Sequence, residues 1–334
     1  MSITITTGGI TMTGGGVSFT APPPSEATAG WFGGGYTPST VSTVSRITFA
    51  TDTATASNRG TLSIARYAIG GTGNFTYGWF SAGYTGLSPT AWTSLVDRIT
   101  YSTDTATATV RGPMNLAIYS HGAIGTTEYG WFTGGYINAT PSANAPRSYV
   151  NRITYATDTD TSSGRGPLAV SQSGAFNVTD STTYGWAAGG FVVATTISTV
   201  SRIIYATDTA TATTRGPLNG SFGQAAGGSS STDTYGWVVS GGFGTGSTTP
   251  TVSTIQRITF ATDTATASVR GNLPNYGYGS RGVGNTTYGW YGGLTGPFRS
   301  TVQRLTYATD TASATDRGPL YAPQAGTGAT SGIQ

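Results

Sequence analysis

The side chains of this 334-residue chain that could do the most chemistry are its 16 arginines, because lysine and cysteine are absent and histidine occurs only as His121. Twelve of these arginines form two regular series, which begin at Arg46 and Arg59. A ring of guanidiniums could bind phosphate, sulfate or carboxylate. Because the two series recur whatever the neighbouring segments contain, we favour a structural role, in which they bond carbonyls or recurring aspartates or stack on aromatic rings. Those aspartates are Asp52, Asp104, Asp158, Asp208, Asp263 and Asp310.

Catalytic and metal-binding chemistry have few candidate residues. The absence of cysteine excludes disulfides, thiolate metal sites and a cysteine nucleophile. A lone imidazole such as His121, predicted on an inner strand beside Tyr119, is more often a hydrogen-bonded structural residue than a base. Asp158 and Asp160 offer too few oxygens in close sequence for a calcium loop. We therefore expect no enzyme, no metal and no cofactor, and interpret the aspartates as turn formers, with Asp104 bonding its own following backbone.

Charge is scarce and evenly spread. Only 9% of the residues are charged, against about 25% in typical domains. Widely spaced arginines and a net charge of +3 do not make the clustered basic face of a nucleic-acid-binding protein. No run of about 18 apolar residues predicts membrane insertion. The N-terminus has no arginine before Arg46 and so does not resemble a secretory signal, which favours assembly in the cytoplasm.

Six copies of a repeating unit determine the architecture. One column reads SRITFATDTATAS in the first copy and DRITYSTDTATAT in the second, and its arginines are 47 to 55 residues apart. A second column, of the type YGWFTGGY, lies about fifteen residues upstream. A third column is the dipeptide RG, often followed by proline. The second column contains six of the seven tryptophans, namely Trp31, Trp79, Trp131, Trp186, Trp237 and Trp290.

Each unit has the composition of four short strands joined by turns. Thr and aromatic residues suit strands, and Gly suits tight turns. The segment at Arg98 alternates, so that Ile99 and Tyr101 share one face and Arg98 and Thr100 share the other. Four-stranded units at this period are typical of propeller blades. We predict an all-β fold, a six-bladed β-propeller over residues 29–334 preceded by a short β-rich arm at residues 1–28.

The order of glycine-doublet strand, aspartate-turn hairpin and basic-proline loop resembles the kelch type of β-propeller over residues 29 to 321. Small Thr and Ala stand where kelch repeats carry a hairpin tryptophan. The YGWF strings followed by glycines, together with the RITYATDT strings, are similar to kelch-like repeats in virion proteins of tailed phages, especially phages of marine bacteria and cyanobacteria. This resemblance implies a structural protein of a bacteriophage virion, associated with its tail, fibre or capsid.

The first repeat lacks its innermost strand, and the last repeat is followed by one additional segment. The first unit begins at a Trp31-type strand, and the last RG column is followed by one further segment. We predict that residues 321–332 complete the blade begun at Ala29 and so close the ring. Closure also removes exposed sheet edges, which would otherwise template aggregation.

Segments that differ between the units are the candidate binding surface. In an antiparallel meander, the turn between the second and third strands emerges on the same face as the connection between blades. The variable segments on this face are Thr85–Leu95, Ile137–Tyr149, Asn275–Gly282 and Thr295–Ser300. Exposed aromatics with arginine suit stacking against sugars or binding a protein, and ordinary loop drift is the alternative. The candidate ligand-binding residues are Trp92, Arg147, Tyr276, Tyr278, Arg281, Phe298 and Arg299.

Residues 1–28 belong to no repeat. Two Thr-rich segments resemble short strands and are followed by Pro22, Pro23 and Pro24, a stiff spacer. Apolar alternation outside a core suggests an arm that adds a strand to a neighbouring subunit, whereas a disordered tail is the alternative. The predicted partner-binding residues of this arm are Ile3, Ile5, Ile10, Val17 and Phe19.

We expect a non-enzymatic virion structural protein, displayed on the particle exterior after assembly in the host cytoplasm. Its partners would be other virion proteins, reached through the arm, in a homo-oligomer or a larger assembly. The alternative is a carbohydrate-binding adhesin or receptor-binding protein, which would recognise a host surface glycan or receptor with the variable face. The sequence does not distinguish tail, fibre and capsid.

Overall fold

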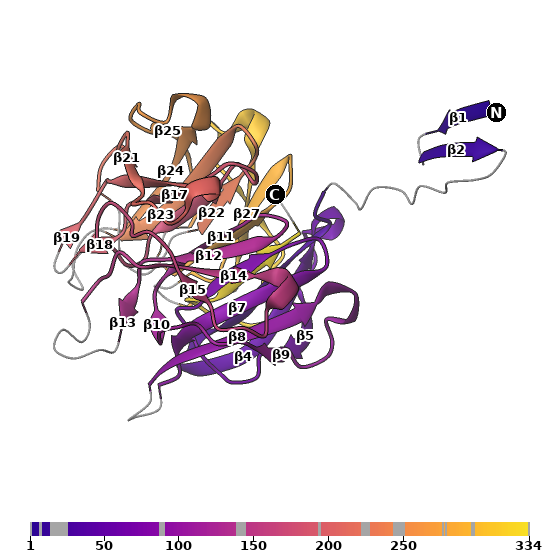
Figure 1. Cartoon of the computed structure of the whole chain (residues 1–334), viewed down its shortest axis with the longest axis horizontal. Coiled ribbons are helices and arrows are strands. Elements are labelled where there is room, and N and C mark those ends of the chain that lie inside the picture. Colours follow the sequence, from indigo (N-terminus) through magenta and orange to yellow (C-terminus); the bar gives the residue numbers. More distant parts are fainter. Residues whose placement is uncertain are drawn as a thin grey trace.

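The computed structural model describes residues 2–6, 9–13, 26–86, 91–137, 145–192, 195–221, 228–242, 251–275, 277, 279–294 and 298–332. Six antiparallel four-stranded sheets are arranged as a β-propeller (Figure 1), which confirms the predicted fold class. The short helical segments are single turns of 3-10 helix, one in each blade. They are η1 (Phe49–Thr51), η2 (Tyr101–Thr103), η3 (Tyr155–Thr157), η4 (Tyr205–Thr207), η5 (Phe260–Thr262) and η6 (Tyr307–Thr309).

The strands of each blade run in order from the channel outwards. Blade 1 comprises β30 (Gly328–Ser331), β3 (Ala29–Thr37), β4 (Ser39–Thr48) and β5 (Ser57–Thr61). Blade 2 comprises β6 (Gly70–Gly73), β7 (Tyr77–Tyr84), β8 (Trp92–Thr100) and β9 (Thr109–Arg111). Blade 3 comprises β11 (Gly122–Gly125), β12 (Tyr129–Thr133), β14 (Val150–Thr154) and β15 (Ser163–Gly164).

Blades 4 to 6 repeat the same order. Blade 4 comprises β16 (Phe176–Thr179), β17 (Tyr184–Ala188), β20 (Val200–Ile204) and β21 (Thr213–Arg215). Blade 5 comprises β22 (Gly228–Ser231), β23 (Tyr235–Gly242), β24 (Thr251–Thr259) and β25 (Ser268–Asn272). Blade 6 comprises β26 (Arg281–Gly284), β27 (Tyr288–Gly292), β28 (Val302–Thr306) and β29 (Thr315–Arg317). Two-stranded extensions are β10 (Ile118–Tyr119) with β13 (Tyr136–Ile137), and β18 (Phe191–Val192) with β19 (Thr195–Thr196).

The last strand of the chain completes the first blade. Within the predicted segment 321–332, the four residues of β30 pair antiparallel with β3, and Thr330 lies opposite Trp31. Each inner strand contacts the next around the ring, in the order β30, β6, β11, β16, β22, β26 and back to β30. The propeller is therefore a closed circle in which both ends of the ring-forming chain share one sheet.

One aspartate holds each pair of neighbouring blades together. At the junction of blades 2 and 3, Asp158 ends the 3-10 turn η3, and its Oδ2 accepts a hydrogen bond from Trp79 Nε1 at 2.8 Å. The same Oδ2 accepts from Arg98 Nη1 at 3.0 Å and lies 3.5 Å from Arg111 Nε. One carboxylate of blade 3 thus binds the tryptophan and both columnar arginines of blade 2.

The same junction occurs six times around the ring. Tryptophan-to-aspartate distances are 2.7 or 2.8 Å in every case. All twelve columnar arginines form ion pairs with a turn aspartate, which confirms the structural role expected for them. The sixth junction, between Trp290 and Asp52, joins blade 6 to blade 1 and closes the circle.

Aromatic stacking reinforces each junction. Trp79 stacks on Tyr155 of the next blade, with ring centroids 3.9 Å apart and planes 7° from parallel. The five equivalent pairs have centroid separations of 3.9 to 4.2 Å. Such a pair contributes about 0.5–1.5 kcal/mol beyond the burial of its surface. In blades 2 to 6 the first columnar arginine also lies over the tyrosine that opens the tryptophan strand, as Arg98 does over Tyr77 at 4.2 Å.

The glycine of the RG column has a steric role at the same junction. The Gly112 N–H donates to the carbonyl of Asp158 at 2.8 Å, and a Cβ on Gly112 would collide with the backbone of Asp160. The side chain and the main chain of the aspartate therefore both bind the preceding blade. The expectation that Asp104 bonds its own following backbone is wrong, because its carboxylate accepts from Trp31 and Arg46 instead. This larger set of donors outcompetes a local turn bond.

The N-terminal hairpin consists of β1 (Ser2–Thr6) and β2 (Gly9–Thr13), which pair antiparallel with each other. Ile3 and Ile5 lie on β1, and Ile10 lies on β2. Val17 and Phe19 lie outside the described residues. The structure thus gives the arm two strands, and its role in partner binding stays a prediction.

We predict that Asp158→Asn lowers the free energy of unfolding by about 2 to 4 kcal/mol, because it leaves two partly buried guanidiniums without their anion. Asp160→Asn is the matched control: this aspartate is exposed in the same turn, and its replacement should change stability by less than about 0.5 kcal/mol. Chemical denaturation measures both values. Equal effects of the two variants would contradict the shared-acceptor junction.

We also predict that deletion of residues 328–334 lowers the melting temperature and causes self-association, because it removes β30 and exposes the edge of β3. Deletion of residues 1–25 is the control and should leave the melting temperature unchanged. Calorimetry and light scattering provide the two readouts. A monomeric deletion product that melts like the full chain would show that ring closure through β30 is dispensable.

Candidate ligand-binding site

A cavity of about 390 Å³ lies at one mouth of the central channel, among the connections between blades. Its described lining comes from blades 1, 2, 3, 4 and 6 and is mainly aromatic. A cavity of this size with aromatic walls and few polar groups is typical of a small-ligand site. The aromatic lining residues are Tyr36, Tyr67, Tyr119, Tyr136, Phe191 and Phe298.

The glycine doublets direct some of these aromatics into the cavity. After β12, Gly134 and Gly135 adopt positive φ angles of 65° and 96°, which glycine tolerates best. A Cβ on Gly134 would also collide with the carbonyl oxygen of Gln172. The turned chain brings Tyr136 into β13, where it pairs with Tyr119 of β10. Equivalent backbone bridges join Tyr36 to Ala325, Tyr84 to Tyr67 and Phe191 to Ser173.

Seven rings form a continuous series, here called the aromatic arc. Neighbouring ring centroids are 5.1 to 6.0 Å apart. Burial raises the pKa of Tyr119 to about 12, and the electrostatic effect of the neighbouring Tyr136 adds to this shift. The phenol of Tyr119 therefore stays protonated and can donate a hydrogen bond. The arc combines apolar ring faces with hydroxyl groups at their edges. Its members are Phe298, Tyr36, Tyr67, Tyr84, Trp92, Tyr119 and Tyr136.

A buried ion pair fixes the connection that carries Tyr67. Arg66 Nη1 donates to Asp97 Oδ2 at 2.8 Å, and both side chains are fully buried. Arg66 Nη2 donates to the carbonyl of Phe80, and the Ser63 N–H donates to Asp97. Burial lowers the pKa of Arg66, and the charge of Asp97 opposes that shift. The pair ties the connection to blade 2 and holds Tyr67 in the arc.

Arg281 provides the positive charge of the cavity. It opens β26 and lines both the wide mouth and a narrower space of about 40 Å³ further along the channel. Its Nη1 donates to the carbonyl of Ser280 at 3.2 Å, and its Nη2 donates to the carbonyl of Ile69 at 3.4 Å. Burial lowers the pKa of Arg281 to about 10, which leaves the guanidinium charged at neutral pH.

Predicted binding residues divide into three groups in the structure. Phe298 and Arg281 line the cavity, and Trp92 packs behind it on Tyr84 and Tyr119. Arg147 and Arg299 do not line the cavity. The backbone of Arg147 forms an isolated antiparallel bridge with the backbone of Gln172, and Arg299 Nη1 donates to the side-chain oxygen of Asn275 at 3.1 Å. Tyr276 and Tyr278 lie outside the described residues. The structure thus gathers three of the described candidates around one cavity.

Other cavity residues are absent from the sequence-based set. Tyr36 and Tyr136 are the last residues of the tryptophan column in their units, and a position within a shared column indicates a structural residue rather than a binding residue. Tyr67 and Tyr119 lie in the connections that lead to the next inner strand. A signal was present, because the column continues to an aromatic residue after the glycines that should end the strand, as in WFGGGY and WFTGGY.

His121 lies near the cavity but is fully buried, and its Nε2 makes a 2.8 Å hydrogen bond with Ser81 Oγ. Burial lowers its pKa to about 3, and the charges of Arg281 and Arg66 add to the shift. The imidazole is therefore neutral, as expected for a structural histidine. In the described residues, no cluster of three or more histidines or acids could hold a metal ion.

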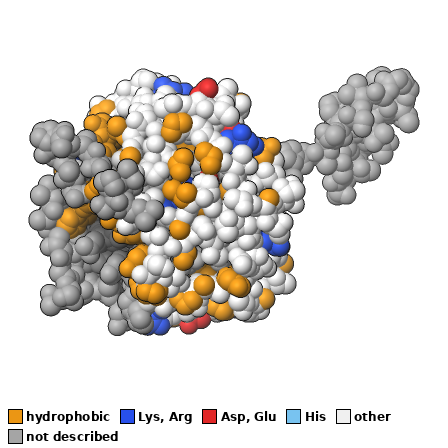
Figure 2. Space-filling view, turned by 90° about the horizontal axis from the view of Figure 1, so that it is seen from below, with side chains coloured by type: hydrophobic (Ala, Val, Ile, Leu, Met, Phe, Trp, Pro, Cys, Tyr) orange, Lys and Arg blue, Asp and Glu red, His pale blue; other side chains and the backbone are white. Residues whose placement is uncertain are grey.

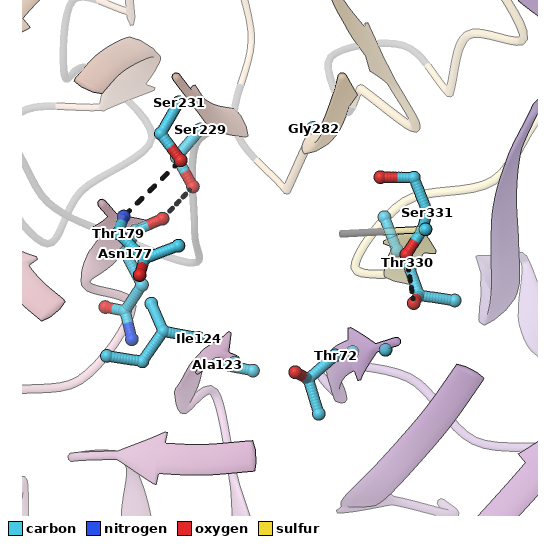
Figure 3. A pocket seen from close by; sticks show the side chains of 15 residues that line it. Thr72, Ala123, Ile124, Asn177, Thr179, Ser229, Ser231, Gly282, Thr330 and Ser331 are labelled. Carbon is cyan, nitrogen blue, oxygen red and sulfur yellow. Dashed lines mark hydrogen bonds between the residues drawn. The ribbon is translucent and has the colours of Figure 1, made fainter. Parts of the chain in front are cut away.

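The far end of the channel is narrower and more polar. A space of about 90 Å³ is lined by hydroxyl groups from several inner strands, together with glycine and alanine (Figure 3). Ser229 Oγ donates to the carbonyl of Asn177, and the Thr179 N–H donates to Ser231 Oγ. Thr72 and Thr330 instead bond the hydroxyls of Tyr155 and Tyr101. The described lining of this end contains no aromatic ring, in contrast to the opposite mouth.

Charged side chains are sparse on the face shown in Figure 2, and apolar side chains gather towards its left edge. No helix among the described residues has the length and apolar character needed to cross a membrane. The chain matches no protein-family model and no curated protein sequence.

We predict that His121 makes folding stability sensitive to mild acid. As pH falls below about 6.5, the unfolded chain binds a proton that folded His121 excludes until about pH 3, so stability is lost through this window. Between pH 7 and pH 4.5, the wild type should lose about 2 to 3 kcal/mol more than His121→Asn. Denaturant titrations at each pH measure the difference. Parallel pH profiles for the two proteins would contradict a neutral buried imidazole.

Proposed function

We propose that this protein is a non-enzymatic phage virion protein whose propeller binds carbohydrate on the host surface. The observation that carries the proposal is the aromatic cavity, because it lies on the face where the six repeats differ and their shared junction residues do not contribute to it. In this proposal the propeller is exposed on a tail, fibre or capsid, and residues 1–28 attach it to other virion proteins. Structural and host-recognition roles then belong to one molecule.

Carbohydrate fits the cavity better than other small ligands. Sugar rings have apolar C–H faces that pack on aromatic rings and hydroxyl groups that need hydrogen-bond partners. Tyr119 and Tyr136 stack with centroids 5.1 Å apart and both line the cavity, so a sugar could contact ring faces and phenols together. A volume of about 390 Å³ lies within the range of small-ligand pockets.

A non-enzymatic role is supported by the chemistry of the cavity wall. Its described lining contains no acid and no histidine, and its one charged residue is Arg281. General acid–base catalysis is carried out mainly by His, Asp, Glu, Lys, Tyr or Cys. Of these residue types the described lining contains only tyrosine, and burial raises the pKa of Tyr119 to about 12, which keeps this phenol protonated at neutral pH. Arg281, with a pKa of about 10, is suited to holding a negative charge at neutral pH.

The virion setting rests on the repeat resemblance and on the arm. The hairpin β1–β2 forms a two-stranded sheet of its own, and two-stranded sheets are marginally stable until they gain a partner. This observation favours a second candidate, a purely architectural part that contacts other virion proteins through residues 1–28. Such a part would bind no saccharide.

We predict that the purified protein binds host cells or a glycan array and that Tyr119→Ala weakens this binding by about three- to tenfold, as expected for the loss of one stacking ring. Tyr321→Ala is the control, because this tyrosine is 54% exposed and does not line the cavity. Failure of the wild type to bind any saccharide would reject the binding role and leave the architectural candidate.

A further inference from the structure

We infer that the ligand of the cavity is an acidic saccharide, whose carboxylate or sulfate group is bound by the Arg281 guanidinium while its ring packs on the aromatic arc. This inference rests on the proposed function and adds the chemical class of the sugar. It follows from the position of Arg281 in the repeat, from its hydrogen bonds and from the distribution of acids in the chain.

Arg281 occupies a position where the other repeats have no charge. It is the first residue of inner strand β26, and the first residues of the other five inner strands are glycine or phenylalanine. Gly70, at this position in β6, has no space for a side chain, because a Cβ there would press against His121. The repeat alone therefore does not require an arginine at this position. The five equivalent residues are Gly70, Gly122, Phe176, Gly228 and Gly328.

The guanidinium of Arg281 has spare hydrogen-bonding capacity. A guanidinium carries five N–H groups. Within the described part of the chain, Arg281 donates only to the carbonyls of Ser280 and Ile69, at 3.2 and 3.4 Å. Arg281 lines the cavity, so its other N–H groups are available to a ligand bound there. A carboxylate or sulfate accepts two parallel bonds from such a fork.

No acid of the protein neutralises Arg281. All thirteen acidic residues lie in the described part of the chain, and none forms an ion pair with it. By contrast, the twelve columnar arginines share six turn aspartates, and Arg66 binds Asp97. A partly buried cation without a counterion is costly, and an anionic ligand would remove that cost.

The surroundings of Arg281 select a singly charged sugar. The described lining of the cavity contains one cationic side chain among aromatic rings and small residues. A polyanion such as nucleic acid would need several cations along its backbone. A neutral sugar would leave the guanidinium unpaired. One acidic group on a sugar ring therefore matches one guanidinium beside the tyrosines.

The test compares methyl β-D-glucuronide and the 6-sulfate of methyl β-D-glucoside with uncharged methyl β-D-glucoside, together with the corresponding galactosides. Affinities are measured by isothermal titration and by NMR shifts. The wild type should bind at least one of the acidic sugars about tenfold or more tightly than its neutral counterpart, since a hydrogen bond to a charged group contributes about 1.5–3 kcal/mol. The carboxylate and sulfate arms identify which anionic group is preferred.

Two variants test whether Arg281 causes the preference for acidic sugars. Arg281→Gly introduces the residue that four other inner strands have at this position, so it should fold, and it should bind acidic and neutral sugars equally. Arg299→Gln is the matched control, because Arg299 does not line the cavity, and it should keep the preference.

Equal wild-type affinity for acidic and neutral sugars would overturn the inference and leave the proposed function intact. A preference that survives in Arg281→Gly, or is lost in Arg299→Gln, would also overturn it. Absence of binding to every saccharide would reject the proposed function together with the inference.

Discussion

The rest of the structure depends on one carboxylate oxygen at each blade junction. Oδ2 of a turn aspartate accepts a hydrogen bond from the indole of the preceding blade and lies within ion-pair distance of both columnar arginines. This arrangement explains the composition, because six aspartates and twelve arginines account for most of the charge in the chain. It also explains the RG and TDT columns, because the arginine and glycine of one blade contact the turn aspartate of the next blade. Blade packing is thus specified by a few residues that every repeat carries.

Because the junctions contain the repeated residues, the opposite end of each blade is free to vary. The glycine doublets mark the boundary between the two regions: positive φ angles at Gly134 and Gly135 turn the chain after the tryptophan strand and deliver Tyr136 to the cavity. Arg281 stands at the same boundary, at the start of an inner strand. The repeated residues hold the ring together at the junctions, and the individual aromatic residues lie at the cavity, so the residues of the cavity could change without loss of the ring.

The sequence was sufficient to predict the ring and its junctions, because those features recur at a fixed period and use local alternation. The six units and the structural role of the columnar arginines were accessible in this way, and the structural role of His121 was expected because it is the only histidine. The cavity was not, because ring closure brings Ile69 and Arg281 within hydrogen-bonding distance although 212 positions separate them. Local patterns also misassigned the Asp104 carboxylate, since its partners Trp31 and Arg46 come from another repeat. Sequence spacing identifies strands, whereas the side chains that meet at the axis depend on how the blades close.

Hydrogen exchange at the six junction indoles measures the shared-carboxylate contacts most directly, because each Nε1–H donates to one turn aspartate. NMR follows these protons one by one. Six equivalent contacts in a closed ring predict that all six indole protons exchange slowly and at similar rates, through opening of the whole propeller. Much faster exchange at Trp290, whose proton donates to Asp52 across the junction of blades 6 and 1, would contradict closure by equivalent junctions.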